Sequence, residues 1–288
     1  MKDEIPSASA PGPADLYLDL LARTLTRALF EDSDRIVGIP TIMEKAKAWV
    51  RVLDRLAPVF GRAQIEVSIK QPYSPSKRET GRDWPARAET MCGLKRLANA
   101  RNCIEHVLSD KIPGDIIETG VWRGGMSIFM RGVLKAYGVT DRTVWLADSF
   151  EGLPIPDVDR YPTDRDLDLS DWKILSVGVE QVRHNFERYG LLDDQVQFIV
   201  GWFRDTLKDT PIKDLAVMRL DGDLYESTIQ ALEPLYPKLS AGGYCIIDDY
   251  GVIDSCKDAV TDYRRAHGIS DEIVDIDGVG IFWRKSSP

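Results

Sequence analysis

Apolar residues near the N-terminus recur at the spacing of an amphipathic helix, which predicts a helix over residues 15–30. The leucines on its apolar face are Leu16, Leu20, Leu21, Leu25 and Leu29. Two further helices are predicted over residues 41–60 and 89–110. Residues 71–85 carry three prolines and one glycine, so they are predicted to form a loop.

The pattern changes after Pro113, where short β-type runs alternate with helical segments. Strands are predicted at 115–118, 143–147, 197–200, 215–220, 244–247, 272–276 and 280–284, and helices at 125–137, 179–189, 227–239 and 254–267. This alternation is typical of an α/β fold with a doubly wound, Rossmann-like sheet. The last two strands are separated by only Asp277, Gly278 and Val279, so they can pair only as an antiparallel hairpin.

The chain therefore divides into three predicted parts. Residues 1–13 are polar and predicted to be disordered, and residues 14–112 to form a helical extension and lid. Residues 113–288 form the α/β domain, in which the long polar insertion 153–176 is predicted to be a lid. Trp172 and Trp202 are candidates for lining a pocket, although ordinary packing is equally compatible with both.

A glycine turn follows the first predicted strand of this domain. Its glycines stand at positions 120, 124 and 125, so it is not the G-x-G-x-x-G turn of dinucleotide-binding proteins. Gly120 would let the backbone approach a ligand, and Glu118 would accept hydrogen bonds from it. Asp148 ends the next strand, where a carboxylate can bind both hydroxyls of a ribose. An ordinary strand-to-helix turn with a loop carboxylate is the alternative.

Aspartates follow two predicted strands that are expected to be neighbours in the sheet. Asp221 and Asp223 follow one strand, and Asp248 and Asp249 follow the next. An all-carboxylate set favours a hard cation such as Mg²⁺. With no basic residue expected between them, these carboxylates would repel one another unless a cation were bound. The alternative is a set of solvated aspartates that cap helices.

Such a site suits the activation of a hydroxyl group, because a metal lowers the pKa of the hydroxyl and a nearby carboxylate takes its proton. Asp223 is the first candidate for the proton acceptor and Asp221 the second. His267, at the end of a predicted helix, is a candidate auxiliary base. Lys257 is a weaker candidate for a contact with substrate.

Composition narrows the choice of partners. The chain is 43% hydrophobic and 29% charged with a net charge of −9, which gives no electrostatic reason to expect nucleic acid or an anionic membrane. None of the four cysteines forms a C-x-x-C pair, so reduced thiols in a cytoplasmic protein are expected. No apolar run approaches the roughly 20 residues that span a bilayer.

Four motifs together resemble the macrocin O-methyltransferase family, which includes mycinamicin and novobiocin sugar O-methyltransferases. They are ETGVWRGG at 118–125, DSFEGLP at 148–154, LDGDLYEST at 220–228 and DDYG at 248–251. The resemblance runs from about Thr90 to Arg284. Residues 1–60 form a longer helical extension than the family leads us to expect.

The resemblance implies a class I S-adenosylmethionine-dependent fold, with a seven-stranded sheet and an antiparallel C-terminal hairpin. It implies Mg²⁺ at Asp221, Asp248 and Asp249, with Asp223 or Asp221 as the base. It implies cofactor contacts from Thr90, Glu118, Thr119, Gly120, Val121, Trp122, Asp148 and Ser149. The expected reaction is methylation of a deoxysugar hydroxyl on a glycosylated natural product in antibiotic biosynthesis, by a homo-oligomer.

Two alternatives remain open from the sequence. A catechol-type O-methyltransferase would use the same metal with a flat aromatic diol. A cofactor-binding protein without catalysis would keep the fold, but it would not need the four clustered carboxylates at positions 221, 223, 248 and 249.

Overall fold

The computed structural model of the protein describes residues 10–37, 48–62 and 65–286. Its centre is a seven-stranded sheet in the order β5-β4-β3-β6-β7-β9-β8. The strands are β3 (Asp115–Thr119), β4 (Val144–Asp148), β5 (Val196–Val200), β6 (Leu215–Leu220), β7 (Leu239–Ile247), β8 (Val274–Asp275) and β9 (Ile281–Arg284). Strands β3 to β7 pair in parallel, and β9 is antiparallel to both β7 and β8. The predicted sheet with its C-terminal hairpin is confirmed.

Helices cover both faces of the sheet, so the central strands are buried on both sides. Ile116 and Leu146 belong to one hydrophobic cluster, and Ile117 and Ala147 to the other. The first cluster includes residues of α1 (Pro13–Leu25), α4 (Leu94–Ser109), α5 (Gly125–Ala136) and α6 (Val179–Arg188). The second includes residues of α8 (Tyr225–Leu235) and α9 (Asp254–Ala266). The alternation of neighbouring strand residues between the two clusters follows from the two-residue period of a strand.

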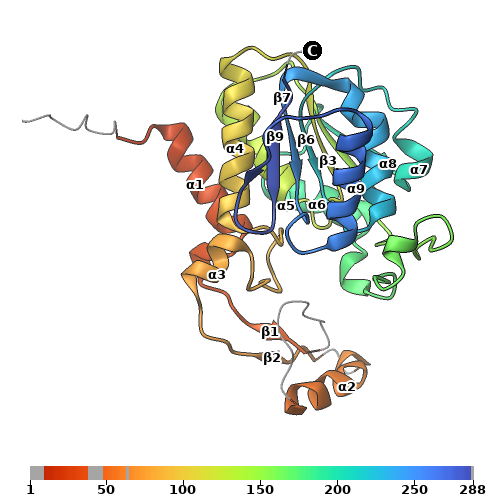
Figure 1. Cartoon of the computed structure of the whole chain (residues 1–288). Helices are drawn as coiled ribbons and strands as arrows, with labels where there is room; N and C mark the ends of the chain where they lie inside the picture. Colours follow the sequence, from red (N-terminus) through yellow and green to blue (C-terminus); the bar gives the residue numbers. More distant parts are fainter. Residues whose placement is uncertain (1–9, 38–47, 63–64, 287–288) are drawn as a thin grey trace, which may run out of the picture.

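The N-terminal helical region is present and shares this core. Leu18, Leu21 and Leu25 of α1 are buried, and α1 packs against α5. After α1 come η1 (Ala28–Phe30), β1 (Arg35–Ile36), α2 (Ala48–Arg62), β2 (Ser68–Ile69) and α3 (Pro75–Thr80). Strands β1 and β2 form a small antiparallel pair that projects from the body together with α2 (Figure 1).

Several predicted boundaries change. The helix predicted from residue 89 begins at Leu94, after its N-cap Gly93. The helix predicted over 41–60 is helical from Ala48 to Arg62, whereas residues 41–47 and the predicted disorder at 1–9 lie outside the described residues. Pro13, which was included in the predicted disorder, begins α1. Helix α8 ends at Leu235 and is followed by η4 (Tyr236–Lys238).

The prediction of a loop over residues 71–85 is partly wrong, because α3 lies within it. Ser74 caps this helix by accepting a hydrogen bond from the Lys77 N–H at 3.4 Å, and Pro75 occupies its first turn. Gly81 ends it in the left-handed conformation. The same prolines and glycine that indicated a loop therefore begin and end a short helix.

The strand register brings the expected site residues to one edge of the sheet. Thr119 pairs with Leu220, and Leu220 pairs with Ile247. The residues that follow these strands, Gly120, Asp221 and Asp248, are therefore adjacent. No helix within the described parts of the chain is long and apolar enough to cross a bilayer.

Replacing Gly120 with alanine should prevent the sheet edge from forming its native structure. Gly120 has a φ of +78°, and an added Cβ would lie 1.6 Å from the Asp221 carbonyl oxygen. We expect Gly120→Ala to cost at least about 3 kcal/mol of unfolding free energy, measured by urea denaturation. Gly138→Ala is the control, because its φ is +66° but no heavy atom of the described chain lies within 4 Å of the added Cβ. The control should cost about 1–2 kcal/mol. Equal losses in the two variants would contradict the steric argument.

Candidate active site

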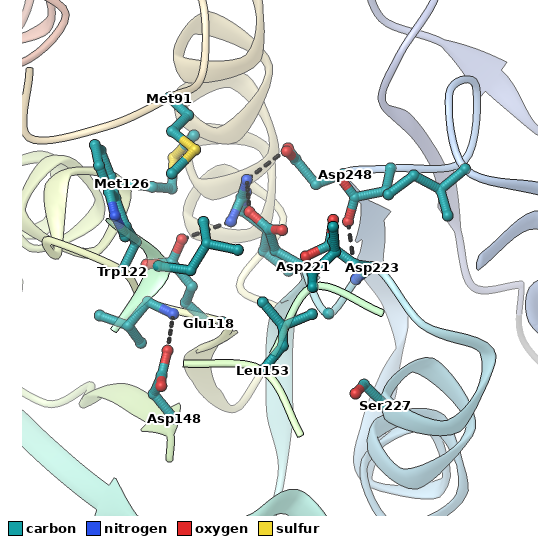
Figure 2. A pocket seen from close by; sticks show the side chains of 18 of the residues that line it. Met91, Glu118, Trp122, Met126, Asp148, Leu153, Asp221, Asp223, Ser227 and Asp248 are labelled. Atoms are coloured by element: carbon teal, nitrogen blue, oxygen red, sulfur yellow. Dashed lines mark hydrogen bonds and ion pairs between the residues drawn. The ribbon is translucent and has the colours of Figure 1, made fainter. Parts of the chain in front are cut away.

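A cavity of about 240 Å³ opens at the carboxyl edge of the sheet. Figure 2 shows side chains from the glycine turn, from Asp148 and from the aspartate loops around it. The predicted cofactor residues that line it are Thr90, Glu118, Gly120, Val121, Trp122, Asp148 and Ser149. The predicted metal and base residues that line it are Asp221, Asp223, Asp248 and Asp249. Thr119 is the exception, because its side chain is buried outside the lining, although its carbonyl accepts from the Asp221 N–H at 3.0 Å.

The glycine turn is fixed to Asp148 at the end of β4. One Asp148 carboxylate oxygen accepts from the Val121 N–H at 2.6 Å, and the other accepts from the Phe150 N–H at 2.7 Å. Burial raises the pKa of Asp148, while these backbone donors favour its charged form. The Ser149 hydroxyl also donates to Asp148 at 3.4 Å, so a ribose hydroxyl would take the place of this longer bond.

Glu118 precedes the turn, near the end of β3, and is 1% exposed. It accepts a hydrogen bond from the Ser127 hydroxyl and another from Arg219 Nη1 at 2.6 Å. Burial raises the pKa of Glu118 to about 7, and the Arg219 charge opposes that rise. The first acid of the turn is therefore already held on both oxygens by the protein.

The aspartates converge as expected. Asp221, Asp248 and Asp249 each offer one carboxylate oxygen, and these oxygens lie within 4.8 Å of one another. The Asp223 N–H donates to Asp249 Oδ2 at 3.3 Å, which connects the two loops. Asp223 itself has a φ of +57°, an uncommon backbone conformation for a residue other than glycine.

Burial and mutual repulsion disfavour the charged forms of three of these acids. Burial, followed by the charge of Asp248, raises the pKa of Asp221 to about 6. Burial and the neighbouring charges of Asp221 and Asp248 raise the pKa of Asp223 to about 7. The pKa of Asp249 is also raised, by burial and then by Asp221 and Asp223.

The expectation that no basic residue lies between the aspartates is wrong. Arg219 Nη2 lies 2.9 Å from Asp221 Oδ2 and 2.5 Å from Asp248 Oδ1, and Arg96 of α4 pairs with the second oxygen of Asp248. Burial alone would raise the pKa of Asp248, but the two guanidinium groups outweigh it and lower that pKa. Arg219 was overlooked because it lies inside an otherwise apolar strand, LAVMRL. A charged residue in a fully buried strand is uncommon and was the available signal.

The acids still outnumber the bases in this cluster. Six carboxylates, those of Glu118, Asp221, Asp223, Asp248, Asp249 and Asp277, face the two guanidinium groups of Arg96 and Arg219. Within the described residues, Asp221 Oδ1 and both Asp249 oxygens have no cationic partner at salt-bridge distance. An oxygen-only donor set with excess negative charge fits a hard divalent cation.

Other candidates are placed away from the cavity. His267 is exposed at the end of α9, where its ring stacks on Tyr263 at 4.1 Å and its Nδ1 lies 2.9 Å from the Tyr263 carbonyl oxygen. Lys257 is exposed beside Tyr250. The structure does not bring His267, Lys257 or Trp172 to the cavity lining, whereas Trp202 is part of it.

The insertion 153–176 forms one wall of the cavity, to which it contributes Leu153, Pro154, Leu169 and Leu175. It contains two short 3-10 turns, η2 (Pro162–Asp164) and η3 (Lys173–Leu175). The Trp122 indole donates to the Ile174 carbonyl at 2.8 Å, so the glycine turn is bonded directly to the insertion.

Asp164 anchors the insertion to α8. Its side chain is fully buried and accepts from the N–H groups of Tyr225 and Glu226, at 2.7 and 3.0 Å. A carboxylate at this place satisfies free donors of the helix and complements its dipole. The Ser255 hydroxyl adds a bond to the Thr163 carbonyl at 2.9 Å.

The sequence profile of the family described as Macrocin-O-methyltransferase (TylF) matches residues 14–285. The chain belongs to the macrocin O-methyltransferase family. It is therefore a methyltransferase, and the resemblance of the four motifs is confirmed. The match begins at residue 14, so it includes most of the N-terminal segment that was expected to depart from the family.

Three named O-methyltransferases are similar to this chain, two of them over 95% of its length. A tetracenomycin glycoside enzyme of Streptomyces olivaceus, named 8-demethyl-8-(2,3-dimethoxy-alpha-L-rhamnosyl)-tetracenomycin-C 4'-O-methyltransferase, is 52% identical over 274 residues, which cover 95% of this chain and 94% of the relative. Mycinamicin III 3''-O-methyltransferase of Micromonospora griseorubida is 45% identical over 276 residues, which cover 95% and 97%. Demethyldecarbamoylnovobiocin O-methyltransferase of Streptomyces niveus is 54% identical over 215 residues, which cover 74% and 82%.

Solved structures agree with the fold. The O-methyltransferase NovP superposes with a TM-score of 0.80 at 45% identity, covering 95% of this chain and all of that one. The calicheamicin methyltransferase CalS11 superposes with a TM-score of 0.55 at 16% identity, which supports the fold alone. The fold is that of class I S-adenosylmethionine-dependent O-methyltransferases.

Removing the Asp164 carboxylate should loosen the insertion. We expect Asp164→Ala to cost about 1–2 kcal/mol of stability and to increase amide hydrogen exchange in residues 153–176. The matched control is Asp168→Ala in the same insertion, because Asp168 is exposed and, among the described residues, bonds only to Ser170. Unchanged exchange across the insertion in Asp164→Ala would show that Asp164 does not anchor it.

Proposed function

We propose that this member of the macrocin O-methyltransferase family transfers a methyl group from S-adenosylmethionine to a hydroxyl of a sugar on a glycosylated natural product, in a Mg²⁺-dependent reaction of antibiotic biosynthesis. The observation that carries the proposal is the meeting of the glycine turn and four aspartates in one cavity. The named relatives support a sugar acceptor over the aromatic diol of a catechol-type enzyme, because one of the names specifies a rhamnosyl group.

The cofactor side of the cavity would hold the methyl donor. Asp148 would accept from its ribose hydroxyls, while Glu118 and the turn through Trp122 would lie against its amino-acid part. Thr90 and Ser149 line the same region. When bound, the donor supplies a methyl group attached to a positively charged sulfur. Transfer forms a bond between that carbon and the acceptor oxygen, breaks the carbon–sulfur bond and releases the hydroxyl proton.

The aspartate side would hold Mg²⁺ through Asp221, Asp248 and Asp249. A cation bound there would lower the pKa of the acceptor hydroxyl. Its positive charge would also offset the repulsion that, together with burial, raises the pKa values of Asp221 and Asp249. Asp248 contributes through lone pairs that its two arginine partners leave free.

Asp223 is the proton acceptor in this proposal, and Asp221 is the second candidate. Asp223 lines the cavity and has no arginine within salt-bridge distance among the described residues. A base works best when its pKa is close to the working pH, and burial with its acidic neighbours raises the pKa of Asp223 to about 7.

The proposal also includes a cytoplasmic homo-oligomer. Leu16, Leu20, Leu29 and Phe30 place apolar side chains on the surface of α1 and η1, where they are 41–59% exposed. Exposed apolar side chains that gather on neighbouring elements are often covered by another chain. Light scattering after gel filtration tests this part, because a single 32.4 kDa species would contradict it.

Chelation should abolish methyl transfer to a glycosylated acceptor, and added Mg²⁺ should restore it. Asp249→Asn should raise the Mg²⁺ concentration for half-maximal activity at least about tenfold, because it removes a ligand without touching either arginine. Lys257→Ala is the control, since this exposed residue lies outside the cavity lining. Full activity of the wild-type protein in excess EDTA would rule out the metal mechanism.

The rate should depend on a base with a raised pKa. Because the carboxylate of the base must be deprotonated to take the proton, kcat/KM should fall about tenfold per pH unit on the acidic side. The apparent pKa of this fall should be at or below about 7. A bound cation would lower this value by favouring the carboxylate. Asp223→Asn should reduce kcat by about 10²–10⁴-fold, measured by methyl transfer across pH 5–9. Asp209→Asn, at an exposed loop position, is the control. An unchanged profile in Asp223→Asn would move the base to Asp221.

A further inference from the structure

Arg219 is buried at the centre of the sheet, where a charged side chain is not needed for the stability of the fold. It is 1% exposed and lies on β6, between β3 and β7. Taking a guanidinium group out of water costs several kcal/mol, and hydrophobic replacements of buried ion pairs are often as stable. The contacts of this side chain therefore indicate what it does.

Those contacts join the two halves of the cavity. Arg219 Nη1 donates to Glu118 Oε1 at 2.6 Å, and these two residues are register partners on adjacent strands. Arg219 Nη2 lies within 2.9 Å of Asp221 Oδ2 and 2.5 Å of Asp248 Oδ1. One rigid, planar group thus binds an acid of the glycine turn and two acids of the aspartate cluster.

A second line of contacts keeps Arg219 and its partners in place. Its Nη2 also donates to the Cys92 thiol at 2.9 Å, whose pKa burial raises to about 12 so that it stays uncharged. Arg96 holds the other oxygen of Asp248, and its Nε lies 3.1 Å from Asp277 Oδ2 in the turn before β9. The chain of ion pairs runs from the C-terminal hairpin to the first strand of the sheet.

We propose that Arg219 is a positioning residue that couples binding of the methyl donor to binding of the divalent cation. Because one side chain contacts Glu118, Asp221 and Asp248, a ligand that orders the acids on its own side of the cavity also orders those on the other side. Each ligand then increases the affinity for the other by the same factor, as linkage requires. The inference rests on the proposed function, because it takes the donor and the cation as the ligands of this cavity.

The test measures binding without turnover. S-adenosylhomocysteine is titrated by calorimetry with and without Mn²⁺, and Mn²⁺ is titrated by electron paramagnetic resonance with and without S-adenosylhomocysteine. In the wild-type protein we expect each to tighten the other about fivefold or more. In Arg219→Gln we expect each affinity alone to fall about tenfold or more, and the coupling factor to fall to about one.

Two variants separate positioning from general stability. Arg219→Lys keeps the charge but cannot bridge the three carboxylates with one planar group, so it should remain folded and still lose the coupling. Arg131→Lys is the matched control, because Arg131 is a buried arginine of α5 that pairs with Asp193 at 2.6 Å outside the cavity lining. It should keep both affinities and the coupling factor.

Failure of this inference is distinct from failure of the proposed function. Wild-type protein that binds neither probe would overturn the proposed function and the coupling with it. Wild-type protein that binds both probes without mutual tightening would overturn the coupling alone. A folded Arg219→Lys or Arg219→Gln variant with the wild-type coupling factor would remove Arg219 from the positioning role.

Discussion

The arrangement of side chains in the cavity depends on the balance between buried carboxylates and buried guanidinium groups at the centre of the sheet. Two guanidinium groups, from Arg219 and Arg96, lie among six carboxylates at the ends of β3, β6 and β7 and in the turn before β9. Without the guanidinium groups, burial and repulsion would oppose ionisation of every acid in the cluster. With them, Asp248 is held in its charged form while Asp221, Asp223 and Asp249 keep raised pKa values. The remaining excess of acid is what favours a divalent cation.

Backbone geometry makes this arrangement rigid. The carbonyl oxygen of Asp221 occupies the space that a side chain at position 120 would need, so the glycine turn and the aspartate loop are in direct contact. The expected role of Gly120, close approach to a ligand, is therefore joined by a structural one. The carboxylate of Asp148 and the indole of Trp122 extend the contact to β4 and to the insertion. Any ligand that orders the turn acts on a structure that already touches the aspartates.

Much of the fold followed from local patterns, and the interactions between distant residues did not. The strand at 215–220 was predicted with its observed bounds, because a short run that is apolar except for Arg219, between polar loops, has few alternatives. The aspartate pairs were predicted because each follows directly after an apolar run, where a strand ends. Arg96 and Asp248 are 152 positions apart, and Asp164 and Tyr225 are 61 apart, so their pairing depends on packing that periodicity does not encode. Helix α3 was missed because prolines and glycines delimit short helices as well as loops.

The different roles proposed for the four aspartates, as metal ligands or as the base, follow from where the arginines lie. Asp248 meets both guanidinium groups and Asp221 meets one, so these two carboxylates have their orientations fixed by the protein. Asp249 meets neither, but it is connected to the backbone of Asp223. A cation held between fixed and unpaired carboxylates would neutralise Asp249 and Asp221 most directly. Asp223, bonded to Asp249 through its N–H and not through its carboxylate, keeps its side chain available for the proton of an acceptor. In the proposed mechanism, the same charge balance would provide a place for the metal and leave one carboxylate as the base.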